Sequence, residues 1–249
     1  MPLIDRNATV AKIALDHPSC APVFRDHRID FCCRGALTLK EACAGKAVDA
    51  GAVFDELERA AREGAPPEVD PRELSTPDLI AYVVGRYHAH LRKALPYAEL
   101  LARRVAHVHG QHNTKLPALA DLVADLRAEL EPHLDDEERT LFPALTARPP
   151  EPERIAHELG TMHEDHLRVG EMLTCIRTLA DDYSCPDWGC GSYRALMREL
   201  VTLELDTLRH VHVENHVLMP RFSARGRPIS RRGARRRGKL TGAASELTK

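Results

Sequence analysis

Two stretches of this sequence share one pattern: HLDDEERTLFP, from His133 to Pro143, and HVHVENHVLMP, from His210 to Pro220. Each has a histidine, a glutamate four residues later, a leucine four residues after that, and a proline at the second position beyond the leucine. On an α-helix, residues four apart lie side by side on one face. Each stretch therefore predicts a helix that presents an imidazole next to a carboxylate.

Helical periodicity continues around both stretches, over residues 76–222. Apolar residues recur every three or four positions there, and no convincing run of alternating β-branched residues indicates a strand. Start and stop signals predict four helices, at about residues 76–107, 117–145, 152–182 and 192–220. Thr76 and Ser192 are the expected N-caps of the first and the last. Because short loops join helices of similar length, we predict an all-α fold based on an antiparallel four-helix bundle.

The apolar face of each predicted helix also carries a histidine. The four are His88, His133, His166 and His210. At a rise of about 1.5 Å per residue, each lies about 15 to 22 Å from the same end of the bundle, so all four fall in one layer. Glu137 and Glu214 share that layer. A buried histidine or glutamate without a partner is costly, so six such groups in one core need a common explanation.

A metal centre explains these six side chains. Imidazole and carboxylate together suit iron, zinc or manganese. Four imidazoles provide two nitrogens for each of two metal ions, and Glu137 and Glu214 can bridge the ions and offset part of their charge. A single His-x3-Glu pair is a weak signal, because solvated helices often carry one. Two pairs in matching frames, at the depth of two further histidines, predict a metal site.

Composition restricts the class of protein. The chain has 249 residues, a formal charge of −2 and 43% hydrophobic residues, which is typical of a globular protein. No apolar run reaches the roughly 18–20 residues of a membrane span, and residues 1–20 lack the order of a secretory signal, so we expect a cytoplasmic protein without membrane contact. The seven cysteines are an odd number, which favours free, metal-bound or redox-active thiols over a disulfide framework.

Proline-rich and charge-rich segments divide the chain. We predict a small helical N-terminal domain over residues 1–63, a linker over 64–75, the bundle over 76–222 and a disordered Arg-rich tail over 223–249. The tail contains nine Lys and Arg residues and one Glu. An acidic body with a basic tail argues against a nucleic-acid-binding fold, whose basic surface belongs to the folded part.

Cys32 and Cys33 are adjacent in the N-terminal domain and precede Arg34. A positive neighbour favours the thiolate form. Taken alone, the pair fits two interpretations equally: thiols that handle redox chemistry, iron or nitric oxide near the bundle or on a client protein, and two small buried residues. Three other cysteines stand among apolar neighbours and are expected in the core: Cys20, Cys43 and Cys175.

The remaining histidines of the bundle are not expected to bind the metal. His109 lies 21 residues after His88, about 31 Å along one continuous helix. Only a break of that helix, for example near Pro96, would bring it to the same site. The other histidines lie off the inward face or near helix ends and are expected to be solvated: His90, His107, His112, His157, His163, His212 and His216. Among them, His163 is the best candidate for a hydrogen bond that supports a ligand.

Residues of about 9 to 222 resemble the Repair of Iron Centres family. The resemblance rests on the order of the two His-x3-Glu segments and of three shorter motifs: Ile29-Asp-Phe-Cys-Cys33, Arg86-Tyr-His88 and Glu164-Asp-His166. It implies a hemerythrin-like bundle holding two non-haem iron ions with an oxo bridge. It further implies four histidine ligands and two bridging glutamates: His88, His133, His166, His210, Glu137 and Glu214.

The resemblance also implies a function. Members of the family repair iron-sulfur clusters damaged by nitrosative or oxidative stress, by iron donation or nitric oxide reduction. Damaged iron-sulfur proteins would then be the partners, nitric oxide or oxygen species the small ligands, and Cys32 and Cys33 functional thiols. The alternative is a hemerythrin-like oxygen-binding, iron-binding or sensing protein without a catalytic step. Whether the chain is an enzyme and whether it forms a homodimer stay open.

One position departs from the family pattern. Many relatives have Cys-Cys-Gly-Gly where this chain has Cys32-Cys33-Arg34-Gly35. If the turn needs a positive φ at the first glycine, Arg34 changes its course.

Overall fold

The computed structural model describes residues 3–46, 48–65 and 67–222. The prediction of a disordered tail over 223–249 falls outside these residues. Within them the fold is all-α without any strand, as predicted; the β-type contact recorded there is a single bridge between Thr9 and Thr38. In the part of the chain described, no helix has the length and apolar character needed to cross a membrane.

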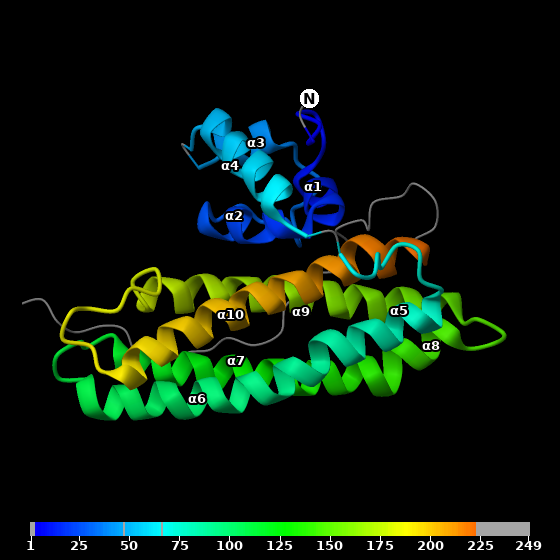
Figure 1. Cartoon of the computed structure of the whole chain (residues 1–249). Helices are drawn as coiled ribbons and strands as arrows, with labels where there is room; N and C mark the ends of the chain where they lie inside the picture. The colour runs from blue at the N-terminus through cyan, green and yellow to red at the C-terminus, as the bar shows by residue number, and fades with distance from the viewer. Residues whose placement is uncertain (1–2, 47, 66, 223–249) are drawn as a thin grey trace, which may run out of the picture.

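Four long helical segments form the bundle (Figure 1). The first consists of α5 (Thr76–Val83), the π-helical turn η2 (Val84–His88) and α6 (Ala89–His109). The second consists of α7 (Leu116–Asp136), the π-helical turn η3 (Glu137–Leu141) and α8 (Phe142–Thr146). The third is α9 (Pro152–Leu179). The fourth consists of α10 (Gly191–Val213), the π-helical turn η4 (Glu214–Leu218) and the 3-10 turn η5 (Met219–Arg221).

Two of the predicted helix caps are wrong by one or two residues. Ser75 caps α5 in place of Thr76, because its hydroxyl accepts a hydrogen bond from the backbone N–H of Asp78. The N-cap of α10 is Cys190, two residues before Ser192. Pro96 lies inside α6 without ending it, so the first segment runs on to His109.

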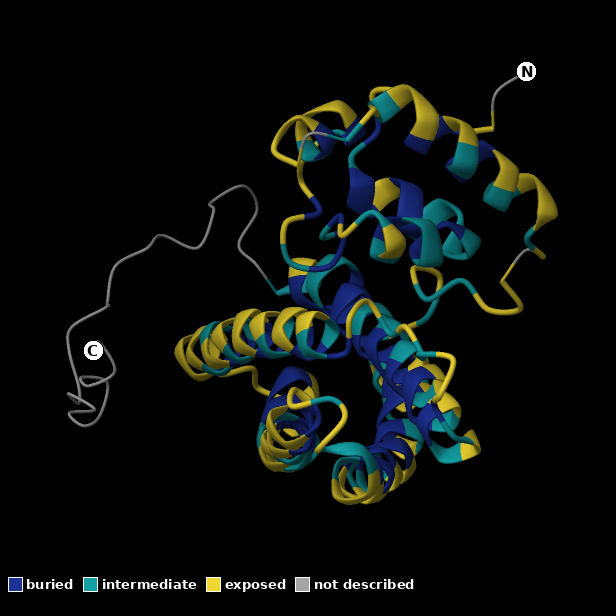
Figure 2. Ribbon diagram, turned by 90° about the vertical axis from the view of Figure 1, so that its left-hand side faces the viewer, coloured by how far each residue is buried: buried dark blue, intermediate teal, exposed yellow. Residues whose placement is uncertain are grey.

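The bundle has two apolar cores, and buried residues face inward from every helix (Figure 2). Helix α6 packs against α7 and α10, and α9 packs against α7. The larger core contains Leu95, Leu126 and Leu200 and fills the half of the bundle near the α6–α7 connection. The smaller one contains Leu79 and Leu218 and fills the half near α5 and α8. Burial of each such leucine contributes about 1.5–3 kcal/mol.

Within its described residues, the N-terminal domain has four α-helices and one 3-10 turn. They are α1 (Val10–Asp16), the 3-10 turn η1 (Pro18–Cys20), α2 (Ala21–Asp26), α3 (Leu39–Ala44) and α4 (Ala50–Glu63). Side-chain caps set three of their starts, at Thr9, Thr38 and Asp49. The domain lies on the α9–α10 side of the bundle (Figure 1). Val211 of α10 belongs to its apolar core, so the two parts share one buried surface.

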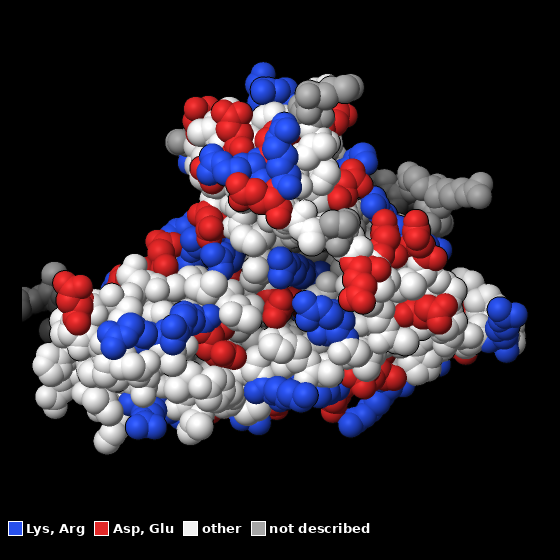
Figure 3. Space-filling view, viewed as in Figure 1, with Lys and Arg blue, Asp and Glu red and all other residues white. Residues whose placement is uncertain are grey.

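Charged side chains are scattered over both parts of the molecule on the face shown in Figure 3. On the face shown in Figure 3, basic and acidic side chains are interspersed and do not separate into one positive and one negative region. Arg127, for example, pairs with both Glu99 and Glu131. Exposed pairs of this kind contribute only about 0–1 kcal/mol each. The stability of the fold therefore depends mainly on the apolar cores.

Candidate metal centre

The structure brings the six predicted metal-site residues together in the middle of the bundle. They form two groups of four that share both glutamates. The first group is His88, Glu137, His210 and Glu214, and the second is His133, Glu137, His166 and Glu214. Within each group the potential ligand atoms lie within 4.8 Å of one another. All six residues are buried, with at most 6% of any of them exposed.

Each glutamate directs one carboxylate oxygen to each group. Oε2 of Glu137 lies 3.3 Å from Nε2 of His88, and its Oε1 lies 3.3 Å from Nε2 of His133. Oε1 of Glu214 lies 3.0 Å from Nε2 of His210, and its Oε2 lies 3.1 Å from Nε2 of His166. Two carboxylates placed between two pairs of imidazoles are suited to bridging two cations.

Three of the six residues lie at the π-helical turns. His88 ends η2, Glu137 begins η3 and Glu214 begins η4. A π-helical turn adds one residue to a helix and rotates the side chains that follow, and such turns are frequent at functional sites. Pro143 and Pro220 each lie two residues after the end of such a turn. A widened turn eases the conflict between a proline ring and the preceding turn of a regular helix.

Outer hydrogen bonds hold three of the four imidazoles. Nδ1 of His88 lies 2.9 Å from Glu138, Nδ1 of His133 lies 3.3 Å from Asp165, and Nδ1 of His166 lies 3.0 Å from Oδ1 of Asn215. Bonds to an acceptor keep the proton on Nδ1 and leave the lone pair of Nε2 facing inward. In the fourth histidine, Nδ1 of His210 makes no hydrogen bond among the described residues. The ring of Tyr87 stacks on it instead, at 5.8 Å between centroids.

Several inward-facing atoms make no well-directed hydrogen bond in the part of the chain described, although they lie within ion-pair distance of one another. They are Nε2 of His133, Nε2 of His166, both carboxylate oxygens of Glu137 and Oε2 of Glu214. A buried polar atom without a partner costs about 1–3 kcal/mol, and more when the group is charged. Because all these atoms face one another across the same space, cations placed between them would satisfy the whole set. The donor set of imidazole nitrogens and carboxylate oxygens therefore fits a metal centre.

The imidazoles and carboxylates of the centre shift one another's pKa values. Burial opposes charge on His133, but the carboxylate of Glu137 and the hydrogen bond to Asp165 outweigh burial and raise the pKa of His133 to about 11. Burial and the charge of Glu214 favour protonation of Glu137, yet the neighbouring His133 and His88 hold the pKa of Glu137 at about 2. A metal ion must therefore displace protons from imidazole when it binds.

Apolar residues keep the centre dry. The ring of Phe142 stacks on His88 at 5.7 Å between centroids. Along the length of the bundle, one apolar core lies on each side of the layer of histidines. Electrostatic interactions are stronger in such surroundings than in water, so two carboxylates attract a cation more strongly here than they would on the surface.

The loop with Cys32 and Cys33 lies directly against the metal centre. Sγ of Cys33 is 3.9 Å from the backbone carbonyl of His166. Nδ2 of Asn215 donates to the carbonyl of Cys32 at 3.0 Å and lies 3.8 Å from Sγ of Cys33. Asn215 thus connects the thiol pair to the outer nitrogen of His166. In this structure the thiol pair lies beside the bundle.

Two histidines expected in solvent hold this loop instead. His212 is 4% exposed, and its Nδ1 lies 3.0 Å from the carbonyl of Phe31. Nε2 of His216 lies 2.9 Å from the carbonyl of Cys32. Both side chains point from the outer face of the fourth segment into the N-terminal domain. The prediction of solvation was wrong because the outer face of a bundle helix becomes an inner face where a second domain packs on it.

Two predictions about the cysteines also need correction. The thiol of Cys32 has a pKa well above its usual value, because of its hydrogen bond to Cys33, its burial and the charge of Asp30, while Arg34 is exposed and does not offset these effects. Cys175 is exposed, because it lies on the outer face of α9, whereas Cys20 and Cys43 are buried as predicted.

The glycine of the motif is required for space. Neither Arg34 nor Gly35 has a positive φ, so Arg34 does not disturb the turn. A Cβ atom on Gly35 would lie 2.5 Å from Cβ of Ala11 and 2.5 Å from the carbonyl oxygen of Phe31.

His109 lies at the far end of α6, away from the metal centre. Its Nε2 is 3.2 Å from Sγ of Cys190. The ring of His109 also lies 5.5 Å from that of Trp188. Helix α6 continues through Pro96, so His109 lies far along the helix from His88. This position agrees with the prediction that His109 is not a metal ligand.

Sequence reasoning missed the outer partners of the histidines. Glu138, Asp165 and Asn215 are each next to a predicted ligand in the chain. A position next to a predicted ligand is the feature of the sequence that could have identified them, but many exposed polar residues also have such a position. Which of them turns toward a neighbouring imidazole depends on how the helices pack.

Comparison with known proteins supports this description. Residues 79–222 match the family described as Hemerythrin HHE cation binding domain, and residues 6–61 match the Domain of Unknown function (DUF542). The chain is 33% identical over 223 residues to the iron-sulfur cluster repair protein ScdA of Staphylococcus haemolyticus, covering 89% of this chain and 100% of the relative. It is 34% identical over 217 residues to the iron-sulfur cluster repair protein YtfE of Edwardsiella ictaluri, covering 87% and 96%. YtfE of Yersinia pseudotuberculosis is 30% identical over 216 residues.

Proposed function

This chain belongs to the family of iron-sulfur cluster repair proteins with a hemerythrin-like domain, and we propose that it restores damaged iron-sulfur clusters through two iron ions held in the bundle. One observation carries the proposal: two groups of buried histidines share the same two glutamates. Its relatives are named for repair, which favours this function over oxygen or iron binding without a catalytic step.

We propose that four histidines bind the metals through Nε2 and that two glutamates bridge them: His88, His133, His166, His210, Glu137 and Glu214. Each ion would then have four protein donors, fewer than the six of octahedral coordination, which leaves room for a small ligand such as nitric oxide or an oxygen species. Two bound iron ions would supply one-electron redox chemistry and iron for a damaged cluster. An oxo bridge between them is part of this proposal.

The protein's own residues orient and protect this centre. Glu138, Asp165 and Asn215 hold the outer imidazole nitrogens, which fixes the direction of the ligand lone pairs. Tyr87 and Phe142 cover imidazole rings and exclude water. We propose that Cys32 and Cys33 take part as functional thiols, because they lie between the centre and the surface of the N-terminal domain.

The test measures metal content and repair in the same preparation. Protein purified without added metal should contain two irons per chain and show a visible spectrum that nitric oxide changes after anaerobic reduction. It should also restore activity to a dehydratase whose iron-sulfur cluster has been damaged by nitric oxide. The Glu137→Gln variant should lose both properties, while Glu131→Gln, on the outside of α7, should keep them. Zinc in place of iron, or equal repair by Glu137→Gln, would contradict the proposal.

A further inference from the structure

A third group of potential metal ligands lies outside the bundle, in the N-terminal loop. Asp30, Cys32 and Cys33 place a carboxylate oxygen and two sulfur atoms within 4.8 Å of one another. Sγ of Cys32 is 3.5 Å from Sγ of Cys33 and 3.3 Å from Oδ1 of Asp30. We propose that these three residues form a second, exchangeable site for a thiophilic divalent cation.

The distances fit one tetrahedral ion. With a metal–sulfur distance of about 2.3 Å, two thiolates on a tetrahedral ion lie about 3.8 Å apart. With a metal–oxygen distance of about 2.1 Å, a carboxylate oxygen lies about 3.6 Å from each sulfur. The two measured separations are each about 0.3 Å shorter, which a small rotation of the side chains provides. A disulfide would need the sulfur atoms at about 2.05 Å, so the observed pair is not bonded.

The loop holds the three side chains in place before any ion binds. Oδ1 of Asp30 accepts hydrogen bonds from the backbone N–H groups of Cys32 and Cys33, at 3.1 and 2.8 Å. The carbonyl of Cys32 is held from the other side by Asn215 and His216. Gly35 keeps the loop close to α1, where a larger residue would not fit.

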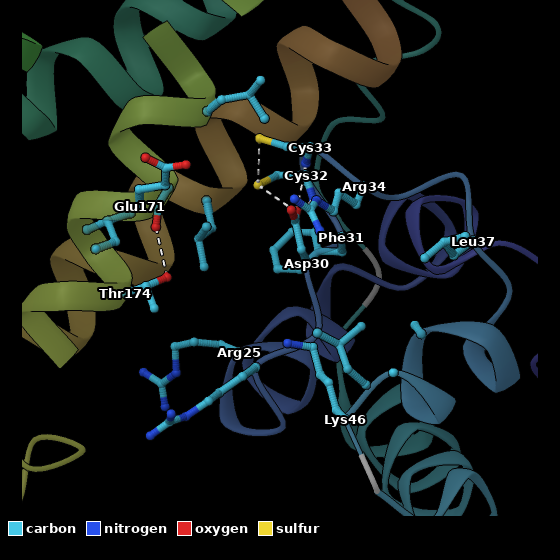
Figure 4. Close-up of a pocket in the computed structure, with 18 of the residues that line it drawn as sticks. Arg25, Asp30, Phe31, Cys32, Cys33, Arg34, Leu37, Lys46, Glu171 and Thr174 are labelled. Carbon is cyan, nitrogen blue, oxygen red and sulfur yellow. Dashed lines mark hydrogen bonds between the residues drawn. The ribbon is translucent and has the colours of Figure 1, made fainter. Parts of the chain in front are cut away.

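The site opens into a cavity. Asp30, Cys32 and Cys33 line a space of about 550 Å³ between the N-terminal domain and α9, and Figure 4 shows both sulfur atoms on its wall. Cys33 and Asp30 are partly exposed. Three protein donors leave one tetrahedral position free on that side, which is the arrangement of metal sites that exchange a ligand.

The carboxylate of Asp30 contacts the Cys32 thiol directly, at 3.3 Å, and forms no ion pair among the described residues. Basic side chains, among them Arg25 and Lys46, line other parts of the same cavity. Binding of one divalent ion would replace the two thiol protons, so two protons leave for each ion bound.

The position of the site gives it a role that rests on the proposed function. Through Asn215 the thiol pair is connected to His166 of the bundle, and on its other side it faces the cavity. An iron ion on its way between the bundle and a damaged cluster would find soft, exchangeable ligands here. The bundle then stores iron, and the loop passes it on.

Cobalt titration of the iron-loaded, reduced protein under anaerobic conditions tests the site. Thiolate-bound Co²⁺ gives a sulfur-to-metal charge-transfer band that imidazole and carboxylate ligands do not give. One equivalent of Co²⁺ should produce this band and release two protons. Cys32→Ser, Cys33→Ser and Asp30→Asn should each weaken or abolish it, while Cys175→Ser, which alters an exposed cysteine of α9, should not.

The outcomes separate this proposal from the function of the bundle. Absence of the band, or a band that persists in Cys32→Ser and Cys33→Ser, overturns the second site whatever the bundle contains. Iron is measured in the same samples before titration. A cobalt band on protein whose bundle holds no iron would support the second site and contradict the proposed repair function.

Discussion

His166 and Asn215 connect the two halves of this molecule, because Nδ1 of His166 lies 3.0 Å from Oδ1 of Asn215, whose amide nitrogen donates to the carbonyl of Cys32. One side chain thus supports an imidazole of the bundle and holds the N-terminal loop. The arrangement makes the orientation of the imidazole depend on the docked loop, and the loop depend on the bundle.

Replacement of Asn215 should separate these two tasks. Asn215→Ala removes the acceptor for His166, and loss of such an outer partner typically weakens metal binding about 10–100-fold. Asn215→Asp keeps an acceptor for His166 but cannot donate to Cys32, so it should retain more of the affinity while loosening the loop. Competition with a metal chelator measures the first effect, and protease sensitivity near Cys33 measures the second. Equal metal affinity in both variants and in the unaltered protein would contradict the assigned role.

Replacing a shared glutamate should remove more metal ions per chain than replacing a histidine that belongs to one group. Glu137 belongs to both groups of potential ligands, whereas His88 belongs to one. We expect Glu137→Ala to lose both metal ions and His88→Ala to lose one in preference to the other. Metal analysis after gel filtration gives the count, and circular dichroism shows whether the helices remain. An equal loss in the two variants would argue against a pair of bridged sites.

Gly35→Ala should destabilise the N-terminal domain. The added Cβ would lie 2.5 Å from two atoms, of which one is a backbone oxygen. Overpacking of this kind typically costs about 1–3 kcal/mol. Gly45→Ala is the matched control, because a Cβ there meets no atom within 4 Å. Urea unfolding of the two variants compares the free energies, and similar values would show that the loop can shift.

Cys190 should react as a thiolate at lower pH than an ordinary cysteine. Its hydrogen bonds to His109 and to the backbone N–H groups of Tyr193 and Ser192 lower the pKa of Cys190 to about 7. Below this pH the thiol is protonated and slow, and above it the thiolate dominates, so its alkylation rate should level off above about pH 8. His109→Ala should move the midpoint upward, toward about 8.5. Mass spectrometry of iodoacetamide-treated protein resolves Cys190 from the exposed Cys175.

Much of the bundle follows from the chain alone. The apolar period of each helix determines which face turns inward, and the four histidines lie on those faces. Since the rise per residue of an α-helix is constant, the depth of His88 and of His133 in the bundle follows from their positions along the chain. Cys20 and Cys43 were correctly expected in the core because their sequence neighbours are apolar.

The π-helical turns were not predictable in this way. The residues from Glu137 to Leu141 would also fit a regular α-helix, so their sequence does not indicate the wider π-helical turn. The turn depends on how the helices pack around the four histidines. The same holds for Asp165, whose carboxylate meets His133 across two helices.

The sequence by itself determined the all-α fold, the layer of four histidines and two glutamates, and the family. These depend on period, spacing and residue type, which are local properties of the chain. The tertiary structure alone decided how the two oxygens of each carboxylate are divided between the two groups, which polar neighbours hold the imidazoles, and that His212 and His216 anchor the N-terminal loop. Those features arise where separate helices or domains meet, and a linear pattern does not record which surfaces come into contact.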